Sequence, residues 1–227
     1  MKLNKLILKN KKGFTIIELL IATSVFAVVL LIATAGVVFV SKSFIKGDVE
    51  AQTQDTARSI LLQISQDIQF SKLSTINVNT GGQYYCIGNH VYVFKLNAEV
   101  SNRSGSGYTP HALLVFDANC PSSPLSSRAV GYVNDLNLPN GGGNSANELL
   151  AQNLRLGQLC IQNIGADRYS VTVTLAYGDQ SVINVTAKNC PSLTPPSGYS
   201  YSCVGSEFGG QFCAYSTLTT SIISRIP

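Results

Sequence analysis

Residues 14–40 read FTIIELLIATSVFAVVLLIATAGVVFV, 27 residues with Glu18 as the single charged side chain. As an α-helix this stretch would reach roughly 40 Å, which exceeds the ~30 Å hydrocarbon core of a bilayer. The preceding residues, 1–13, hold five lysines and no acid. Such basic flanks stay on the cytoplasmic side of a membrane. The stretch therefore predicts a single-pass helix with a cytoplasmic N-terminus and the rest of the chain outside.

Glu18 decides between the possible roles of this segment. A cleaved secretory signal would need a shorter apolar region, of about 7–15 residues, before a small-residue site. Ala33-Thr34-Ala35 offers such a site, but the apolar run is too long and continues through Val40. A plain anchor fits the length and leaves Glu18 unexplained, although a carboxylate inside the bilayer costs a few kcal/mol and is a functional hypothesis by default.

The segment 11–22, KKGFTIIELLIA, resembles the N-terminus of type IV pilins and type II secretion pseudopilins. The resemblance implies that a prepilin peptidase cuts between Gly13 and Phe14, that Phe14 is then N-methylated, and that Glu18 is the fifth residue of the mature chain. The implied partners are this peptidase and N-methyltransferase, other pilin subunits through the N-terminal helix, the inner-membrane assembly platform, and membrane lipid before assembly.

Two interpretations of Glu18 follow from its position. Cleavage would leave an ammonium on Phe14 at a helix start, where a positive charge opposes the helix dipole. Glu18, four residues later on the same face, could compensate that charge within the chain. Alternatively, Glu18 could pair with the Phe14 ammonium of a neighbouring subunit, where an unpaired carboxylate in apolar surroundings would be costly. The family resemblance favours the second interpretation.

The helical pattern continues beyond Val40, and no proline occurs before Pro110. Apolar residues recur at helical spacing after residue 43, at Phe44, Ile45, Val49, Ala57, Ile60, Leu61, Ile64, Ile68 and Leu73. We expect one helix from about Thr15 to about Lys72, whose second half packs on a domain. The predicted organisation is a basic leader (1–13), a membrane and filament-core helix (14–40), its amphipathic continuation (41–76), and an extracytoplasmic β-rich domain with disulfides (77–227).

The predicted fold class is α+β, with the long helix packed on an antiparallel, pilin-like sheet. The β-rich runs are 83–87, 90–96, 112–116, 157–163, 169–177, 181–187 and 215–223. Turn signals at 88–89, 165–167 and 178–179 separate several of them. The segments 169–177 and 181–187 make the best hairpin, and 101–108 and 138–147 are expected to be loops.

All six cysteines lie in the predicted outer domain, at Cys86, Cys120, Cys160, Cys190, Cys203 and Cys213. An even number in an oxidising exterior favours disulfides. Six cysteines allow 15 pairings, and a loop closed between Cys190 or Cys203 and Cys213 is one expectation. A zinc site at Cys86 and His90 is disfavoured because a paired ligand set is missing.

The sequence contains no recognisable enzyme motif, and Asp117, Asp135, Asp167 and Asp179 are isolated along the chain. We therefore expect no enzymatic activity, no cofactor and no metal site. Without the leader the chain carries 11 basic against 12 acidic side chains, a net charge of −1. That balance does not indicate nucleic-acid binding. The aromatic tail residues (Tyr199, Tyr201, Phe208, Phe212 and Tyr215) could form a binding surface, although core packing is the simpler expectation.

The sequence thus predicts the precursor of a structural subunit of a type IV pilus or a type II secretion-like pseudopilus. A minor or tip subunit is favoured over a major one, and the filament could support adhesion, motility, DNA uptake or secretion. The alternative is a membrane-anchored surface adhesin or receptor that does not polymerise. An enzyme is the third choice.

Overall fold

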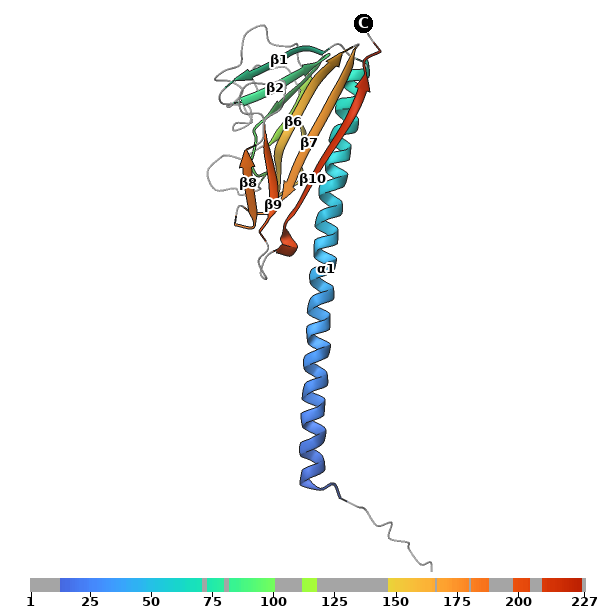
Figure 1. Ribbon diagram of the computed structural model, residues 1–227, viewed down its shortest axis with the longest axis vertical. Helices are drawn as coiled ribbons and strands as arrows, with labels where there is room; N and C mark the ends of the chain where they lie inside the picture. The colour runs from blue at the N-terminus through green and yellow to red at the C-terminus, as the bar shows by residue number, and fades with distance from the viewer. Residues whose placement is uncertain are drawn as a thin grey trace, which may run out of the picture. The chain divides into compact units, whose positions relative to one another are not determined.

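The computed structural model describes residues 13–70, 73–79, 82–100, 112–117, 147–165, 167–179, 181–187, 198–204 and 210–225. One long helix, α1 (Ile16–Phe70), is followed by antiparallel strands (Figure 1), which confirms the predicted α+β class. The chain divides into two compact units, Met1–Phe44 and Ile45–Pro227. Helix α1 contributes residues to both, and each unit is described separately below.

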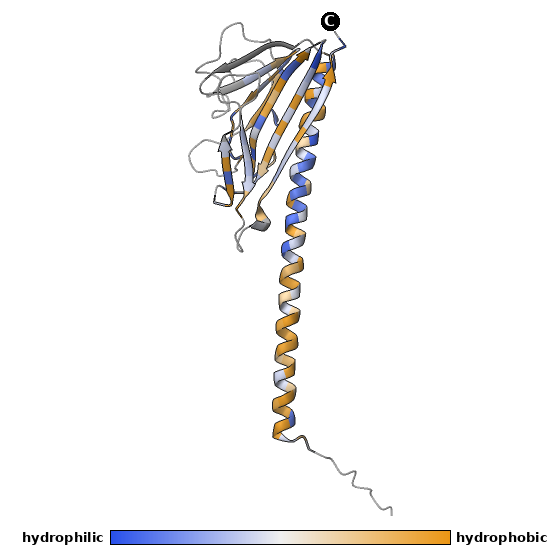
Figure 2. Cartoon of the chain, in the orientation of Figure 1, coloured by the Kyte–Doolittle hydropathy of each residue, from blue (hydrophilic) through white to orange (hydrophobic). Residues whose placement is uncertain are grey.

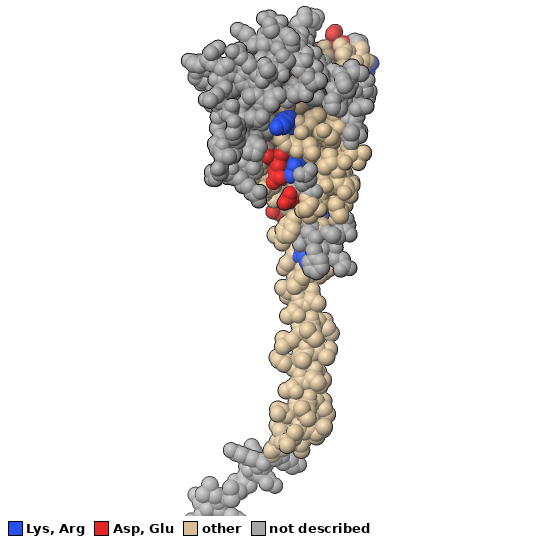
Figure 3. All heavy atoms as spheres, turned by 90° about the vertical axis from the view of Figure 1, so that its left-hand side faces the viewer, with Lys and Arg blue, Asp and Glu red and all other residues tan. Residues whose placement is uncertain are grey.

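In the first unit, most residues of α1 between 16 and 40 are hydrophobic, as the orange stretch of the helix in Figure 2 shows. Its large apolar side chains are exposed, with Leu31 70% and Phe39 72% accessible. In Figure 3 the lower part of the helix shows no charged side chain on the face that is drawn. By length and composition, α1 is the one helix among the described residues that could cross a membrane. None of the described residues of this unit, 13–44, buries this apolar surface, which is the kind of surface that lipid or another molecule would cover.

In the second unit, one face of α1 is buried, through Val49, Thr53, Ala57, Ile60, Leu61, Ile64 and Ile68. These residues follow the helical spacing that the sequence showed, with Thr53 added to it. Phe44, the first residue of the expected stripe, is instead 76% exposed. The helix is also shorter than expected. It ends at Phe70, and Leu73 already pairs with Ile87 in a sheet.

Among the described residues of the second unit, the strands form three antiparallel sheets. The largest has the order β1-β2-β3-β4-β5, formed by β1 (Leu73–Asn79), β2 (Gly82–Ile87), β3 (His90–Phe94), β4 (Leu113–Asp117) and β5 (Asn147–Glu148). The second has the order β10-β7-β6, formed by β6 (Leu154–Gly165), β7 (Arg168–Tyr177) and β10 (Ala214–Ile223). The third pairs β8 (Ile183–Ala187) with β9 (Tyr199–Cys203), and a short 3-10 helix (Gly210–Phe212) precedes β10.

The main core lies between the buried face of α1 and the two larger sheets. Ile60, Ile64 and Ile68 share one apolar cluster with side chains of β2, β3, β4, β6, β7 and β10. Arg225, which follows β10, contacts the last residues of α1. The Arg225 amide donates a hydrogen bond to the Gln69 carbonyl at 3.1 Å, and the Arg225 guanidinium lies 5.7 Å from the centre of the Phe70 ring. A helix carbonyl that lacks an intrahelical partner is thereby satisfied.

The predicted hairpin of residues 169–177 and 181–187 is wrong. Strand β7 pairs with β6 on one side and β10 on the other, so neither edge is open to β8. Gly178, at φ +126°, redirects the chain, and β8 pairs with β9 instead. The hairpin that does form joins β6 to β7, where Gly165 (φ +95°) and Asp167 (φ +56°) adopt left-handed conformations.

A buried arginine fastens several segments of the second unit together. Arg155 of β6 donates from Nε to the Gly178 carbonyl at 3.2 Å and from Nη1 to the Asn97 carbonyl at 3.3 Å. Its Nη2 pairs with Glu99. The Tyr201 hydroxyl of β9 donates to Asn97 Oδ1 at 3.2 Å, which connects the smallest sheet to the same cluster. This arrangement satisfies the charge of a guanidinium that is buried in the fold.

Candidate functional site

The Gly13–Phe14 peptide bond, the predicted cleavage point, lies just outside the helix. Residues 13–15 are not helical, and α1 begins at Ile16. Phe14 is 83% exposed, and a side-chain carbon added at Gly13 would meet nothing within 4 Å. Proteolysis requires access to backbone whose hydrogen bonds are not committed to a helix. The geometry at Gly13 and Phe14 provides that access.

Glu18, the predicted assembly residue, closes the start of the helix. The Thr15 amide and the Thr15 hydroxyl both donate hydrogen bonds to Glu18 Oε2, at 3.0 and 2.9 Å. The Glu18 amide in turn faces Thr15 Oγ1 at 3.3 Å. Thr15 is thus the N-cap residue and Glu18 the third helical residue of a capping box. Two of the amides that a helix start leaves unpaired are satisfied in this way.

This capping box refines the two interpretations of Glu18. The carboxylate does have an intrachain partner, but that partner is Thr15. The spacing Thr15-x-x-Glu18 is the sequence signature of a capping box, so the signal was present in the sequence and was missed. Glu18 Oε2 is occupied, whereas no hydrogen bond to Oε1 occurs among the described residues. One carboxylate oxygen therefore remains available for a cation.

The other polar side chains of residues 14–40 are also satisfied within the helix. Thr23 and Ser24 donate to the Leu20 and Ile21 carbonyls at 3.0 and 2.8 Å. Thr34 donates to the Leu30 carbonyl at 2.9 Å. Hydroxyl back-bonding of this kind is how Ser and Thr residues are accommodated where water is absent. The segment can therefore enter an apolar environment without leaving an unsatisfied hydroxyl.

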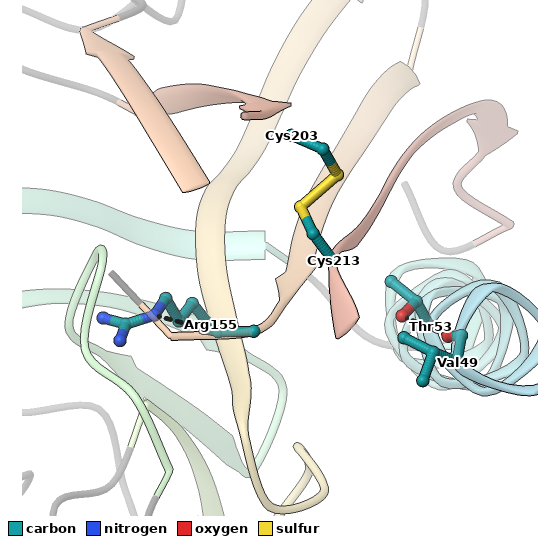
Figure 4. Close-up of a disulfide and its surroundings, with 6 residues drawn as sticks. Val49, Thr53, Arg155, Cys203 and Cys213 are labelled. Atoms are coloured by element: carbon teal, nitrogen blue, oxygen red, sulfur yellow. Dashed lines mark hydrogen bonds between the residues drawn. A yellow bond between two sulfur atoms is a disulfide. The ribbon is translucent and has the colours of Figure 1, made fainter. Parts of the chain in front are cut away.

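The disulfide of Cys203 and Cys213 joins the end of β9 to the residue before β10 (Figure 4). This is one of the two pairings that the sequence left open for Cys213. Cys86 and Cys160 are also disulfide-bonded, while Cys120 and Cys190 lie outside the described residues. Figure 4 draws Val49 and Thr53 of α1 in the surroundings of the disulfide, and both are buried. The disulfide lies in the second unit, where it connects the last residue of β9 with the residue that precedes β10.

The remaining candidate residues concern a metal site. No group of three or more His, Cys, Asp or Glu is placed to hold a metal there, and Cys86 is consumed by a disulfide. His90 instead contacts two aspartates, Asp67 and Asp117, so Asp117 is not isolated in space as it is in sequence. Asp135 lies outside the described residues.

The aromatic tail residues divide between the core and the surface. Tyr201 is buried, with 6% of its surface accessible, and Tyr199 packs against the same small cluster. Phe212 and Tyr215 are 48% and 51% exposed. Phe208 lies outside the described residues. The aromatic tail therefore does not form one continuous exposed surface from the residues that the structure describes.

Comparison with known proteins assigns the N-terminal segment. Residues 8–34 match the family described as the prokaryotic N-terminal methylation motif. The match includes Gly13, Phe14 and Glu18 and confirms the resemblance to the precursors of type IV pilins and pseudopilins. The motif implies processing by a prepilin peptidase and assembly with other pilin subunits. No curated protein and no solved structure matches the chain.

Proposed function

We propose that this chain is the precursor of a structural filament subunit, cut between Gly13 and Phe14 and methylated on the new N-terminus. The observation that carries the proposal is the methylation motif at residues 8–34. It coincides with an exposed, non-helical Gly13–Phe14 bond and a capped helix start. The apolar half of α1 then anchors the precursor in the membrane and afterwards forms the filament core. The chain itself supplies no enzymatic activity and needs no cofactor.

Glu18 selects the axial register of assembly in this proposal. Its Oε2 stays with Thr15, while Oε1 binds the Phe14 ammonium of a neighbouring subunit. A carboxylate in an apolar bundle is strongly disfavoured without a counter-charge, so misaligned packing is penalised. The ammonium exists only after cleavage, which makes assembly dependent on processing.

A minor or tip subunit is favoured over a major one. Residues 14–227 leave a large mature chain for a simple repeating subunit, and the second unit alone covers Ile45–Pro227. A filament accommodates a bulky subunit more easily at a few positions than at every position along its length. Filament roles in adhesion, motility, DNA uptake or secretion are all compatible with this proposal.

The test compares the wild-type chain with two variants of Glu18. Each of the three is produced together with the other, unaltered subunits of the filament. Glu18→Gln keeps a carbonyl oxygen for the Thr15 capping box and removes the charge. Glu18→Val removes both. We expect normal leader removal in all three and at least about a tenfold loss of both variants from sheared filaments, because each lacks the counter-charge. Thr15→Ser, which preserves the cap, serves as the control. Wild-type incorporation of Glu18→Val would contradict the assembly role and favour a membrane-anchored adhesin.

A further inference from the structure

The first turn of α1 carries backbone groups that hydrocarbon cannot accommodate. The capping box satisfies the amides of Thr15 and Glu18, and the Leu19 amide donates to the Thr15 carbonyl at 3.2 Å. The Ile16 and Ile17 amides have no acceptor among the described residues. An N–H group without an acceptor is strongly disfavoured in hydrocarbon, where no water can replace the missing partner. The first turn therefore requires water or polar lipid headgroups around it.

The charged residues indicate where the segment that tolerates hydrocarbon begins and ends. Glu18 is the last charged residue before the apolar stretch, and Lys42 is the next one along the chain. Residues 19–41, which lie between them, carry no charge. Each hydroxyl in this range donates to a helix carbonyl, as Ser41 does to Val37 at 2.9 Å. Residues 19–41 thus form a helical segment with no charge and no unsatisfied hydroxyl.

The length of this segment fits one bilayer. The 23 residues from 19 to 41 rise about 34 Å as a helix, which is close to the ~30 Å hydrocarbon core. The longer stretch 14–40 would rise roughly 40 Å. A bilayer centred on that stretch would bring the Glu18 carboxylate and the two unpaired amides into hydrocarbon. The shorter segment avoids both penalties.

We propose that the bilayer covers residues 19–41 of the precursor, and that the first turn of α1 lies in the polar interface on the leader side. This register rests on the proposed function, in which α1 anchors the precursor in a membrane. The Gly13–Phe14 bond then stays in contact with water. Glu18 also stays hydrated in the precursor and enters apolar surroundings only on assembly, when the Phe14 ammonium of a neighbouring subunit is there to pair with it.

Single tryptophans can measure this register, because the chain contains no tryptophan. Leu20→Trp, Leu30→Trp and Val40→Trp each replace an exposed side chain of α1, so none of them removes a core contact. The full precursor, with its leader, is reconstituted in phosphatidylcholine vesicles. Bromine atoms on the lipid, placed either near the headgroup or near the ends of the acyl chains, quench a tryptophan that lies at their own depth. The wild-type chain supplies the background signal.

The proposed register predicts a symmetrical depth profile. Residue 30 is the midpoint of 19–41, and residues 20 and 40 are equally far from it. We expect Leu30→Trp to be quenched most by the deep bromines, and Leu20→Trp and Val40→Trp to be quenched by the shallow bromines to within about 20% of each other. Acrylamide in the water should quench Ile17→Trp at least about threefold more strongly than Leu30→Trp.

The same measurements separate a wrong register from a wrong function. Unequal depths of Leu20→Trp and Val40→Trp would overturn the register. A deeper Leu20→Trp would move the midpoint towards residue 27, so that the span would be 14–40, and the membrane anchor of the proposed function would stand. Absence of bromine quenching at all three positions would contradict the register and the membrane anchor together.

Discussion

The two parts of α1 share one backbone and differ in what covers them. Between residues 16 and 44 the apolar side chains are exposed on every side. Between residues 45 and 70 a single stripe is buried against strands, and the opposite face is polar, apart from exposed residues such as Leu62. The second part obtains its solvent protection from its own chain. The first part obtains no such protection from the described residues, and under the proposed function lipid and then other subunits supply it.

This difference separates folding from assembly. Substitutions on the buried stripe act on the free energy of unfolding, because they remove contacts inside the chain. Substitutions of apolar side chains in the first part remove no buried contact among the described residues, because these side chains are exposed. Under the proposed function we expect their consequences in membrane insertion and filament formation. The predictions that follow test this separation, beginning with the largest expected effect.

Ile64→Ala should lower the free energy of unfolding by about 2–5 kcal/mol, because the side chain is completely buried in the main core. The matched control, Leu62→Ala, is two residues away on the exposed face and should change it by less than about 0.5 kcal/mol. Leu31→Ala should leave unfolding unchanged. Chemical denaturation followed by far-ultraviolet circular dichroism measures all three. Equal losses for Ile64 and Leu31 would break the comparison.

Replacing Cys203 and Cys213 together by Ser should destabilise the second unit by about 2–3 kcal/mol, since the bond closes a short loop with a sequence separation of 10. The same denaturation assay under non-reducing conditions measures this loss. Leader removal at Gly13 should proceed normally in this variant. A variant that is both stable and poorly cleaved would show that the two regions are not separable in the way we describe.

Tyrosine ionisation at alkaline pH should act on the second unit, because all ten tyrosines lie at or beyond Tyr84. Burial raises the pKa of Tyr85 to about 12, and burial also raises the pKa of Tyr92 and of Tyr201. A folded-state pKa above the unfolded value of about 10 means that this stability is present below pH 10. Between about pH 10 and 12, the raised pKa of Tyr85 should lower the free energy of unfolding by roughly 2 kcal/mol.

Tyr85→Phe supplies the control for this titration. The variant loses the hydrogen bond that the Tyr85 hydroxyl donates to the Leu159 carbonyl at 3.1 Å, so it should be less stable at neutral pH. Its stability should then fall less steeply above pH 10. Denaturation midpoints of the wild-type chain and the variant are recorded between about pH 10 and 12. If the midpoint falls with pH equally steeply in both, the result would argue against titration of Tyr85.

The smallest expected effect is a gain. A side-chain carbon at Gly47 would meet nothing within 4 Å, so Gly47→Ala should stabilise α1 by about 0.5–1 kcal/mol through its helix propensity. Gly157→Ala is the opposite case. There the added carbon would lie 2.3 Å from Tyr201 Cε2, at the bulge of β6, and the variant should be destabilised. Equal denaturation midpoints for the two variants would contradict the packing described for β6 and β9.

Local patterns in the sequence were sufficient for the helix, the α+β class and most strands. Long-range pairing was not readable from them. The Gly178-Asp179 turn signal suggested a β7–β8 hairpin, yet it carries no information that β10, far along the chain, already occupies the edge of β7. The predicted continuation of the helix, 41–76, includes the first four residues of β1 (Leu73–Asn79), whose polar sequence LSTINVN becomes a strand through pairing with β2.

The candidate site shows the same limit at shorter range. Gly13, Phe14 and Glu18 were found from the motif, which the family match supports. The Thr15–Glu18 capping box follows the spacing Thr15-x-x-Glu18, which is present in the sequence, and the hydrogen bonds of the structure establish it. The cluster of Asp67, His90 and Asp117 had no sequence signal, because only the packing of α1 beside β3 and β4 brings these residues together.

The mass of the N-terminal peptide of the mature protein, in cells with and without prepilin peptidase, tests the central claim most directly. The account predicts a peptide that begins with N-methylated Phe14 when the peptidase is present and a retained leader when it is absent. A leader retained in both strains would contradict processing at Gly13, and the assembly role of Glu18 would be rejected with it.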